Sequence, residues 1–108
     1  MKIVNLTPHP LNFYKNGQGI LTIESSGFVR ATVTSTQTGV VNGFPISNLT
    51  FGQVEGMPEP KKDTIYIVSK ITADALKEQG RMDDIFITDK AVRDQDGKII
   101  GCEGLAQV

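Results

Sequence analysis

The sequence predicts an α+β domain with a mostly antiparallel, mixed β-sheet and one helix in a C-terminal βαβ unit. Short runs rich in β-branched residues alternate with turn residues through the first half of the chain. One stretch, Lys70–Gln79, carries apolar residues at helical spacing, and the apolar runs Thr64–Val68 and Ile85–Ile87 flank it. Residues 1–108 are expected to form a single domain, because this length suits one hydrophobic core.

The first half of the chain is expected to form short strands and turns. The Asn-Gly pair within Asn16–Gly19 favours the positive φ angles of a hairpin turn. Thr36–Gly43 has turn residues at both ends, so only its Val40–Val41 pair is expected to join a strand there, and briefly. Strands are predicted at Lys2–Leu6, Leu11–Tyr14, Ile20–Ile23, Phe28–Ser35 and Leu49–Val54.

The chain changes character at Glu55–Asp63, where two prolines, a glycine and five charged residues predict an exposed connection. The Thr64–Val68 run that follows is typical of a strand buried on both faces. Ser69 or Thr72 is the expected N-cap of the helix, and Gly80 is well placed to end it.

The elements of the second half are expected to pair in two ways. Strand, helix and strand in this order and at this spacing predict a βαβ unit, in which the two strands are parallel. A hairpin is expected at the C-terminus, from Val92–Arg93 through a turn at Asp94–Gly97 to Lys98–Cys102.

Composition removes several classes of protein. Eleven Lys and Arg residues against twelve Asp and Glu residues give a net charge of -1, so bulk-charge binding of duplex nucleic acid or of a membrane is not expected. The single cysteine, Cys102, and the single histidine, His9, predict neither a disulfide framework nor a metal site, and no cofactor is expected. Without a membrane span or a signal peptide in the sequence, the expected location is the cytoplasm.

The most unusual stretch is Asn5–Pro10, in which two prolines restrict the backbone on both sides of His9. An imidazole held this rigidly suits a ligand contact, so Asn5, Thr7 and His9 are predicted to bind ligand. The alternative is that Asn5 and Thr7 only stabilise a turn, through hydrogen bonds from side chain to backbone.

The carboxyl ends of the parallel strands are the second candidate site, because ligands in open sheets bind beyond such ends. Ser69 and Lys70 follow one strand at the helix N-terminus, where free N–H groups favour an anion, and Thr88 follows the other strand. Arg93, beside the C-terminal turn, has a fork of donors that fits a phosphate. The alternatives are an ordinary helix cap and solvated basic side chains.

No catalytic residue is predicted, and the protein is not expected to be an enzyme. The acidic residues are scattered, and no pair of them stands out as a catalytic dyad. His9 has no nucleophile or orienting acid that the sequence identifies. Cys102 falls between glycines in an apolar segment and is expected to be a buried small hydrophobic residue.

Three separated motifs resemble those of a widespread family of small proteins encoded by phages, prophages and bacterial chromosomes. They are Asn-Leu-Thr-Pro-His at Asn5–His9, the mid-chain segment Val54–Pro60 with Thr64–Ser69 after it, and the closing segment Val92–Cys102. The resemblance covers nearly the whole chain, and the three motifs occur in order.

The setting that this resemblance implies suggests a function by analogy. Small phage proteins of this size include oligomers that sequester the nucleotide second messengers of bacterial anti-phage defence. This chain is therefore expected to bind such a nucleotide without hydrolysing it, as a homo-oligomer in the bacterial host cell. Two other functions stay open: a protein-interaction module that inhibits or scaffolds a host or phage protein, and a nucleotide hydrolase that uses His9.

Overall fold

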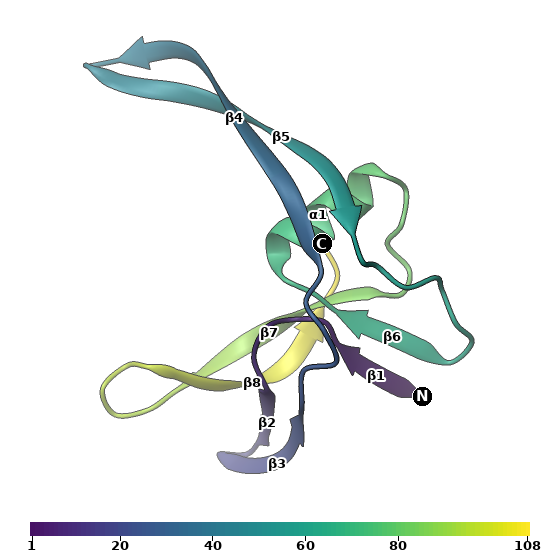
Figure 1. The fold of residues 1–108 in the computed structure, drawn as a ribbon. Coiled ribbons are helices and arrows are strands. Elements are labelled where there is room, and N and C mark those ends of the chain that lie inside the picture. Colours follow the sequence, from purple (N-terminus) through teal and green to yellow (C-terminus); the bar gives the residue numbers. More distant parts are fainter.

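The structure is a computed structural model that describes residues Met1 to Val108 and contains eight strands and one helix (Figure 1). Strands far outnumber helices and the single helix lies in the C-terminal half, so the predicted α+β class is confirmed. The elements in chain order are β1 (Lys2–Asn5), β2 (Leu11–Lys15), β3 (Gln18–Ile23), β4 (Arg30–Val41), β5 (Phe44–Glu55), β6 (Thr64–Ile67), α1 (Lys70–Glu78), β7 (Ile85–Arg93) and β8 (Ile99–Ala106).

Six strands form one mixed sheet in the order β1-β6-β7-β8-β2-β3. β6 pairs with β1 on one side and with β7 on the other, in parallel both times, so the predicted βαβ unit is confirmed. β8 pairs antiparallel with β7, and β2 pairs antiparallel with β3. A single parallel pair, Phe13 opposite Cys102, joins β2 to β8 and so joins the two halves of the sheet.

β7 is longer than the sequence predicted. The segments Ile85–Ile87 and Val92–Arg93 were expected to be separate strands, but they are the two ends of one strand that pairs along its length with β8. Thr88, Asp89 and Lys90 between them are polar and exposed, so the sequence has no apolar alternation there that would mark a strand. Lys90 also has a φ of 55°, outside the usual range of a strand. The predicted turn at Asp94–Gly97 is confirmed, because Asp94 Oδ1 accepts hydrogen bonds from the backbone N–H of Asp96 and of Lys98.

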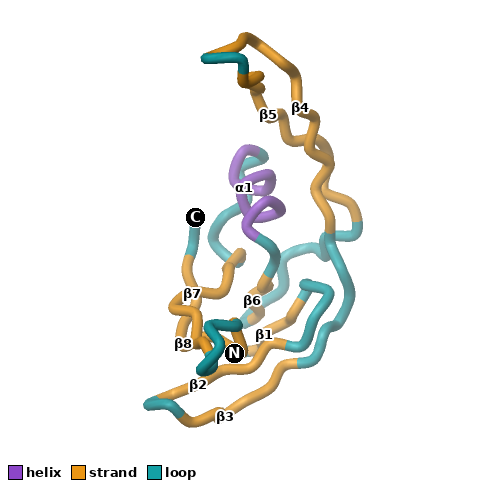
Figure 2. Tube along the Cα trace, turned by 90° about the vertical axis from the view of Figure 1, so that its left-hand side faces the viewer, coloured by secondary structure: helices purple, strands orange, loops and turns teal.

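β4 and β5 form a two-stranded ribbon, here called the β4–β5 arm (Arg30–Glu55), that projects from the rest of the molecule (Figures 1 and 2). The expected interruption over Thr36–Gly43 is wrong. β4 continues to Val41, and the chain reverses at Asn42 and Gly43, whose φ angles of 51° and 83° are the positive values that a two-residue hairpin turn requires. The polar residues in this segment pair across the ribbon instead of forming a loop.

The helix α1 begins and ends where the sequence predicted. Ser69 is the N-cap, and its side chain accepts a hydrogen bond from the backbone N–H of Thr72, while Gly80 follows the helix with a φ of 86°. Thr72 is buried and donates from Oγ1 to the carbonyl oxygen of Val29, which ties the helix to the foot of the β4–β5 arm. No helix in the structure combines the length and the apolar character that crossing a membrane requires.

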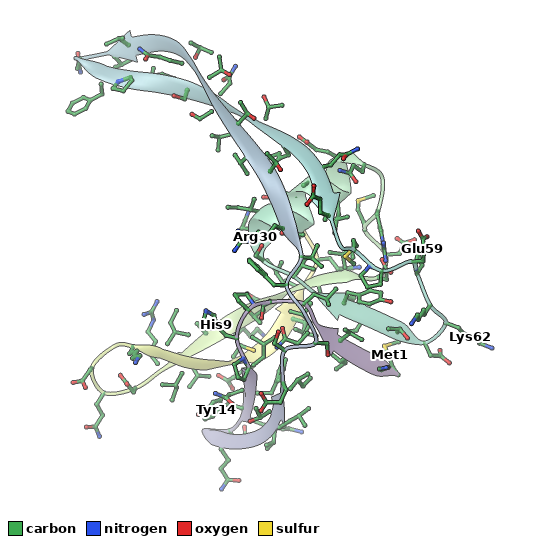
Figure 3. All side chains as sticks on the ribbon, viewed as in Figure 1. Met1, His9, Tyr14, Arg30, Glu59 and Lys62 are labelled. Carbon is green, nitrogen blue, oxygen red and sulfur yellow. The ribbon has the colours of Figure 1, made fainter.

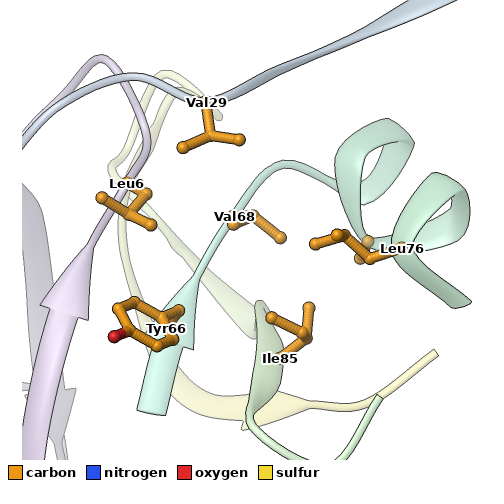
Figure 4. Close-up of a cluster of buried hydrophobic side chains, with 7 residues drawn as sticks. Leu6, Val29, Tyr66, Val68, Leu76 and Ile85 are labelled. Carbon is orange, nitrogen blue, oxygen red and sulfur yellow. The ribbon is translucent and has the colours of Figure 1, made fainter. Parts of the chain in front are cut away.

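The hydrophobic core is small, since only 12 of the 108 residues are buried. It forms where α1 packs on β6 and β7 beneath the foot of the arm (Figure 4). Seven side chains make up its central cluster: Leu6, Val29, Tyr66, Val68, Ala73, Leu76 and Ile85.

Candidate functional site

The largest cavity, of about 630 Å³, lies between the start of β2, β8 and Thr88 of β7. It is called the β2–β8 cavity below. Its walls come from segments far apart in the sequence, which the pairing of β2 with β8 brings together. The lining residues are His9, Pro10, Leu11, Asn12, Thr88, Lys98, Ile99, Ile100, Gly101 and Cys102.

Asn12 and Gly101 hold the two sides of this cavity together. The Asn12 side chain donates from Nδ2 to the carbonyl oxygen of Ile100 at 3.2 Å, and its Oδ1 accepts from the Thr22 hydroxyl at 2.8 Å. Gly101 lets the strands approach closely, since a Cβ added there would lie 2.5 Å from the carbonyl oxygen of Asn12. The cavity therefore depends on a close contact between β2 and β8.

The turn before β2 brings His9 to the cavity, and Asn5 organises that turn. The Asn5 side chain is completely buried; it donates to the carbonyl oxygens of His9 (2.8 Å) and Ile23 (3.0 Å) and accepts from the Thr7 backbone N–H (2.9 Å). The Thr7 hydroxyl donates to Asn5 Oδ1 at 2.6 Å. These bonds satisfy Asn5 within the protein, so Asn5 and Thr7 position His9 and do not themselves line the cavity.

Besides Asn12, which joins the two sides of the cavity, three polar side chains line it. Figure 3 shows His9 beside the β7–β8 hairpin, from which Thr88 and Lys98 also line the cavity. An imidazole, an ammonium group and a hydroxyl can each donate a hydrogen bond to an anion. No aspartate or glutamate lines the cavity, although acidic residues slightly outnumber basic ones in the whole chain.

Apolar side chains form the rest of the wall. Pro10 and Leu11 contribute from the start of β2, and Ile99 and Ile100 from β8. The Ile99 side chain is 56% exposed, so a ligand in the cavity could cover apolar surface that water now contacts. A cavity with apolar walls and a few donors is the usual form of a small-molecule site.

The structure brings together only part of the predicted site. His9 and Thr88 line the same cavity, whereas Ser69, Lys70 and Arg93 do not line it. Ser69 serves as the helix cap, Lys70 forms an ion pair with Asp74 at 3.0 Å, and Arg93 donates to the carbonyl oxygen of Gly97 at 2.7 Å.

Sequence reasoning missed Lys98 and Asn12 as site residues. Lys98 directly follows the Asp94–Gly97 turn, so its place just before β8 could be predicted. The contact between β8 and β2 could not, because it joins segments almost at opposite ends of the chain. The signal that could have found Lys98 was the expected hairpin, combined with a search for cations near its turn.

Cys102, one of the residues that line the cavity, is expected to react slowly with iodoacetamide at neutral pH. Its side chain is buried, and burial raises the pKa of the thiol, an effect that a hydrogen bond from the Gly104 backbone reduces only in part. The reactive thiolate is therefore scarce in the folded protein. Mass spectrometry of protein alkylated with and without urea measures this, and equal rates in the two conditions would contradict it.

The chain has neither a cluster of metal-ligating side chains nor a match among known proteins. No group of three or more His, Cys, Asp or Glu side chains lies close enough together to hold a metal ion. Comparison of the chain with protein-family models, with curated proteins and with solved structures finds no match.

Proposed function

We propose that the β2–β8 cavity binds an anionic small molecule of the nucleotide class and that the protein sequesters this ligand without hydrolysing it. The observation that carries the proposal is the composition of the cavity. His9, Thr88 and Lys98 can donate to a phosphate, no carboxylate lines the walls to repel one, and apolar side chains adjoin these donors. A nucleotide has the matching parts, a charged phosphate and a flat, largely apolar base.

The size of the cavity agrees with such a ligand. Its volume of about 630 Å³ falls within the range of roughly 300–1,000 Å³ that is usual for small-molecule sites. Lys98, just before β8, supplies a point charge, and His9, in the turn before β2, supplies a directed donor to the same cavity. The apolar walls can contact the base or the ribose without forming specific hydrogen bonds to either.

Sequestration is the favoured use of this binding. The three sequence motifs resemble those of small phage and prophage proteins, and some phage proteins of this size sequester the second messengers of bacterial anti-phage defence. The analogy of size and setting, and not the motifs themselves, favours a ligand of this kind. Holding such a ligand requires affinity for its ground state, whereas hydrolysis requires groups aimed at a transition state. The donors in the cavity suit ground-state binding, since they match charge that the free nucleotide already carries.

Ligand binding is expected to raise the thermal midpoint. The probes are cyclic dinucleotides, cyclic trinucleotides and ADP-ribose, each added to the purified protein. A ligand present at 100 times its Kd adds about 2.7 kcal/mol, which raises the midpoint by roughly 10 °C in a domain of this size. Mass spectrometry of the ligand after release should recover it unchanged. No shift with any probe would contradict binding, and a converted ligand would contradict sequestration.

The cavity variants Lys98→Ala and His9→Ala test whether the ligand occupies this site. Each is expected to weaken binding about 10-fold to 100-fold, the loss that follows removal of a hydrogen bond to a charged group. Lys77→Ala, which removes an exposed lysine from the last turn of α1, is the matched control and should bind like the unmodified protein. If Lys70→Ala weakened binding and Lys98→Ala did not, the site would lie at the helix N-terminus instead.

A further inference from the structure

The β4–β5 arm exposes an unusual amount of apolar surface. Phe44 at its tip is 74% exposed, and Leu49 near its middle is 61% exposed. Two side-chain hydrogen bonds form in its outer part, from Gln37 to Gly39 and from Thr38 to Ile46. Both join residues of the arm to one another and not to the rest of the molecule. Its large exposed apolar residues are Val33, Val40, Val41, Phe44, Ile46 and Leu49.

The arm also lacks charge. Between Arg30 and Glu55 there is no Asp, Glu, Lys or Arg, although such residues make up 21% of the chain. Exposed strand edges usually carry charged residues that prevent pairing with another chain. A neutral surface offers no charge pattern by which an acidic or basic partner could be selected. It can, however, pack against a copy of itself without any repulsion between like charges.

The overall dimensions indicate how much surface is available for packing. The accessible surface is 7488 Å², whereas a compact monomer of 11.7 kDa would expose about 5,900 Å². The difference, about 1,600 Å² over the whole chain, exceeds the roughly 800 Å² that each partner buries in an interface of ordinary size, and the projecting arm contributes to it. The radius of gyration of 16.3 Å likewise exceeds the roughly 13 Å of a compact chain of this length.

We propose that the β4–β5 arm is a self-association surface, on which the arm of a second copy of this chain packs its apolar side chains. The base of the arm packs on α1, but its outer part is a two-stranded ribbon alone, which is at best marginally stable in water. A partner that covers the outer part would stabilise it. The same residues meet in both copies, which makes the contact symmetric and closed. None of the residues that line the β2–β8 cavity belongs to the arm, so this inference does not depend on the proposed ligand.

The test is the mass of the protein in solution, measured by light scattering after size exclusion at 10–100 µM. The unmodified protein should have at least twice the 11.7 kDa mass of one chain, and Leu49→Asp should lower it to that of one chain. Ile20→Asp is the matched control, since Ile20 on β3 is also 61% exposed but lies outside the arm. A monomeric unmodified protein, or a Leu49→Asp variant that associates like the control, would overturn the proposal.

Hydrogen exchange on the unmodified protein gives a second measurement that does not depend on a variant folding. Amides of Val33–Val41 and Phe44–Phe51 should exchange at least 10-fold more slowly at 100 µM than at 1 µM, because association covers the ribbon. Amides of β6, which lie in the core at both concentrations, should not change. Arm amides that exchange at the same rate at both concentrations, in a protein that is monomeric at both, would overturn self-association through the arm.

Discussion

Replacing Asn5 with alanine is expected to lower the free energy of unfolding by about 3 kcal/mol or more. Asn5 is completely buried, and its amide donates to two carbonyl oxygens, those of His9 and Ile23, while its Oδ1 accepts from the Thr7 backbone N–H. Alanine leaves these three backbone groups without their partner. Each buried polar group left without a hydrogen-bond partner costs about 1–3 kcal/mol. Water that enters the turn in the variant would restore only some of the lost hydrogen bonds, so only part of this cost is regained.

The measurement is urea unfolding of Asn5→Ala beside Gln107→Ala. Gln107 also donates its amide to two carbonyl oxygens, those of Met82 and Asp83, but it does so on the surface. Its removal is expected to cost less than about 0.5 kcal/mol, because water replaces the lost bonds. If the two variants unfolded at the same urea concentration, the buried network around Asn5 would not stabilise the protein as the structure indicates.

The same substitution separates positioning from ligand contact. Asn5 lines no part of the β2–β8 cavity, yet it fixes the carbonyl group of His9, which does. Ligand affinity should therefore fall in Asn5→Ala even at temperatures where the protein stays folded. Asn5 and Thr7 can therefore stabilise the turn while His9 binds ligand. The two interpretations are compatible, because the turn that Asn5 and Thr7 stabilise is the one that carries His9.

The sequence predicted those elements whose signals are local. Ser69 and Gly80 flank the helix as capping rules that need only neighbouring residues predict, and the apolar run at Thr64–Val68 marks the strand β6. The Asn16–Gly17 turn is similar: both residues have positive φ angles, of 52° and 79°, as an Asn-Gly pair favours. Each of these structures forms from contacts within a few residues.

The errors concern contacts that no local pattern records. Turn residues at both ends of Thr36–Gly43 predicted an interruption, but the segment up to Val41 pairs with β5 in an arm that is exposed and so needs no apolar alternation. The pairing of Phe13 with Cys102 likewise has no local signal. Since this pairing creates the cavity, His9 and Thr88 could be singled out one by one, but their meeting with Lys98 could not.

Replacing Gly101 with alanine is expected to separate β2 from β8 and to remove the cavity. The added Cβ would lie 2.5 Å from the carbonyl oxygen of Asn12 and 2.6 Å from Cδ2 of Tyr14, closer than real Cβ contacts come. The clash is with backbone as well as with a ring, so a side-chain rotation alone cannot relieve it. Forcing extra volume into such a contact costs about 1–3 kcal/mol, and we expect a midpoint about 10 °C lower together with loss of ligand binding.

Gly104→Ala, on the same strand, distinguishes this clash from the general effect of losing a glycine. A Cβ at Gly104 would meet only Cδ of Lys90, at the ordinary distance of 3.8 Å. There the substitution should be neutral or stabilise the protein by up to about 1 kcal/mol, because alanine restricts the unfolded chain. If Gly101→Ala had the same thermal midpoint as Gly104→Ala and still bound ligand, β2 would not lie against β8 at Gly101. The β2 wall of the cavity would then be held against β8 by other contacts, such as the hydrogen bond from the Asn12 side chain to the carbonyl oxygen of Ile100.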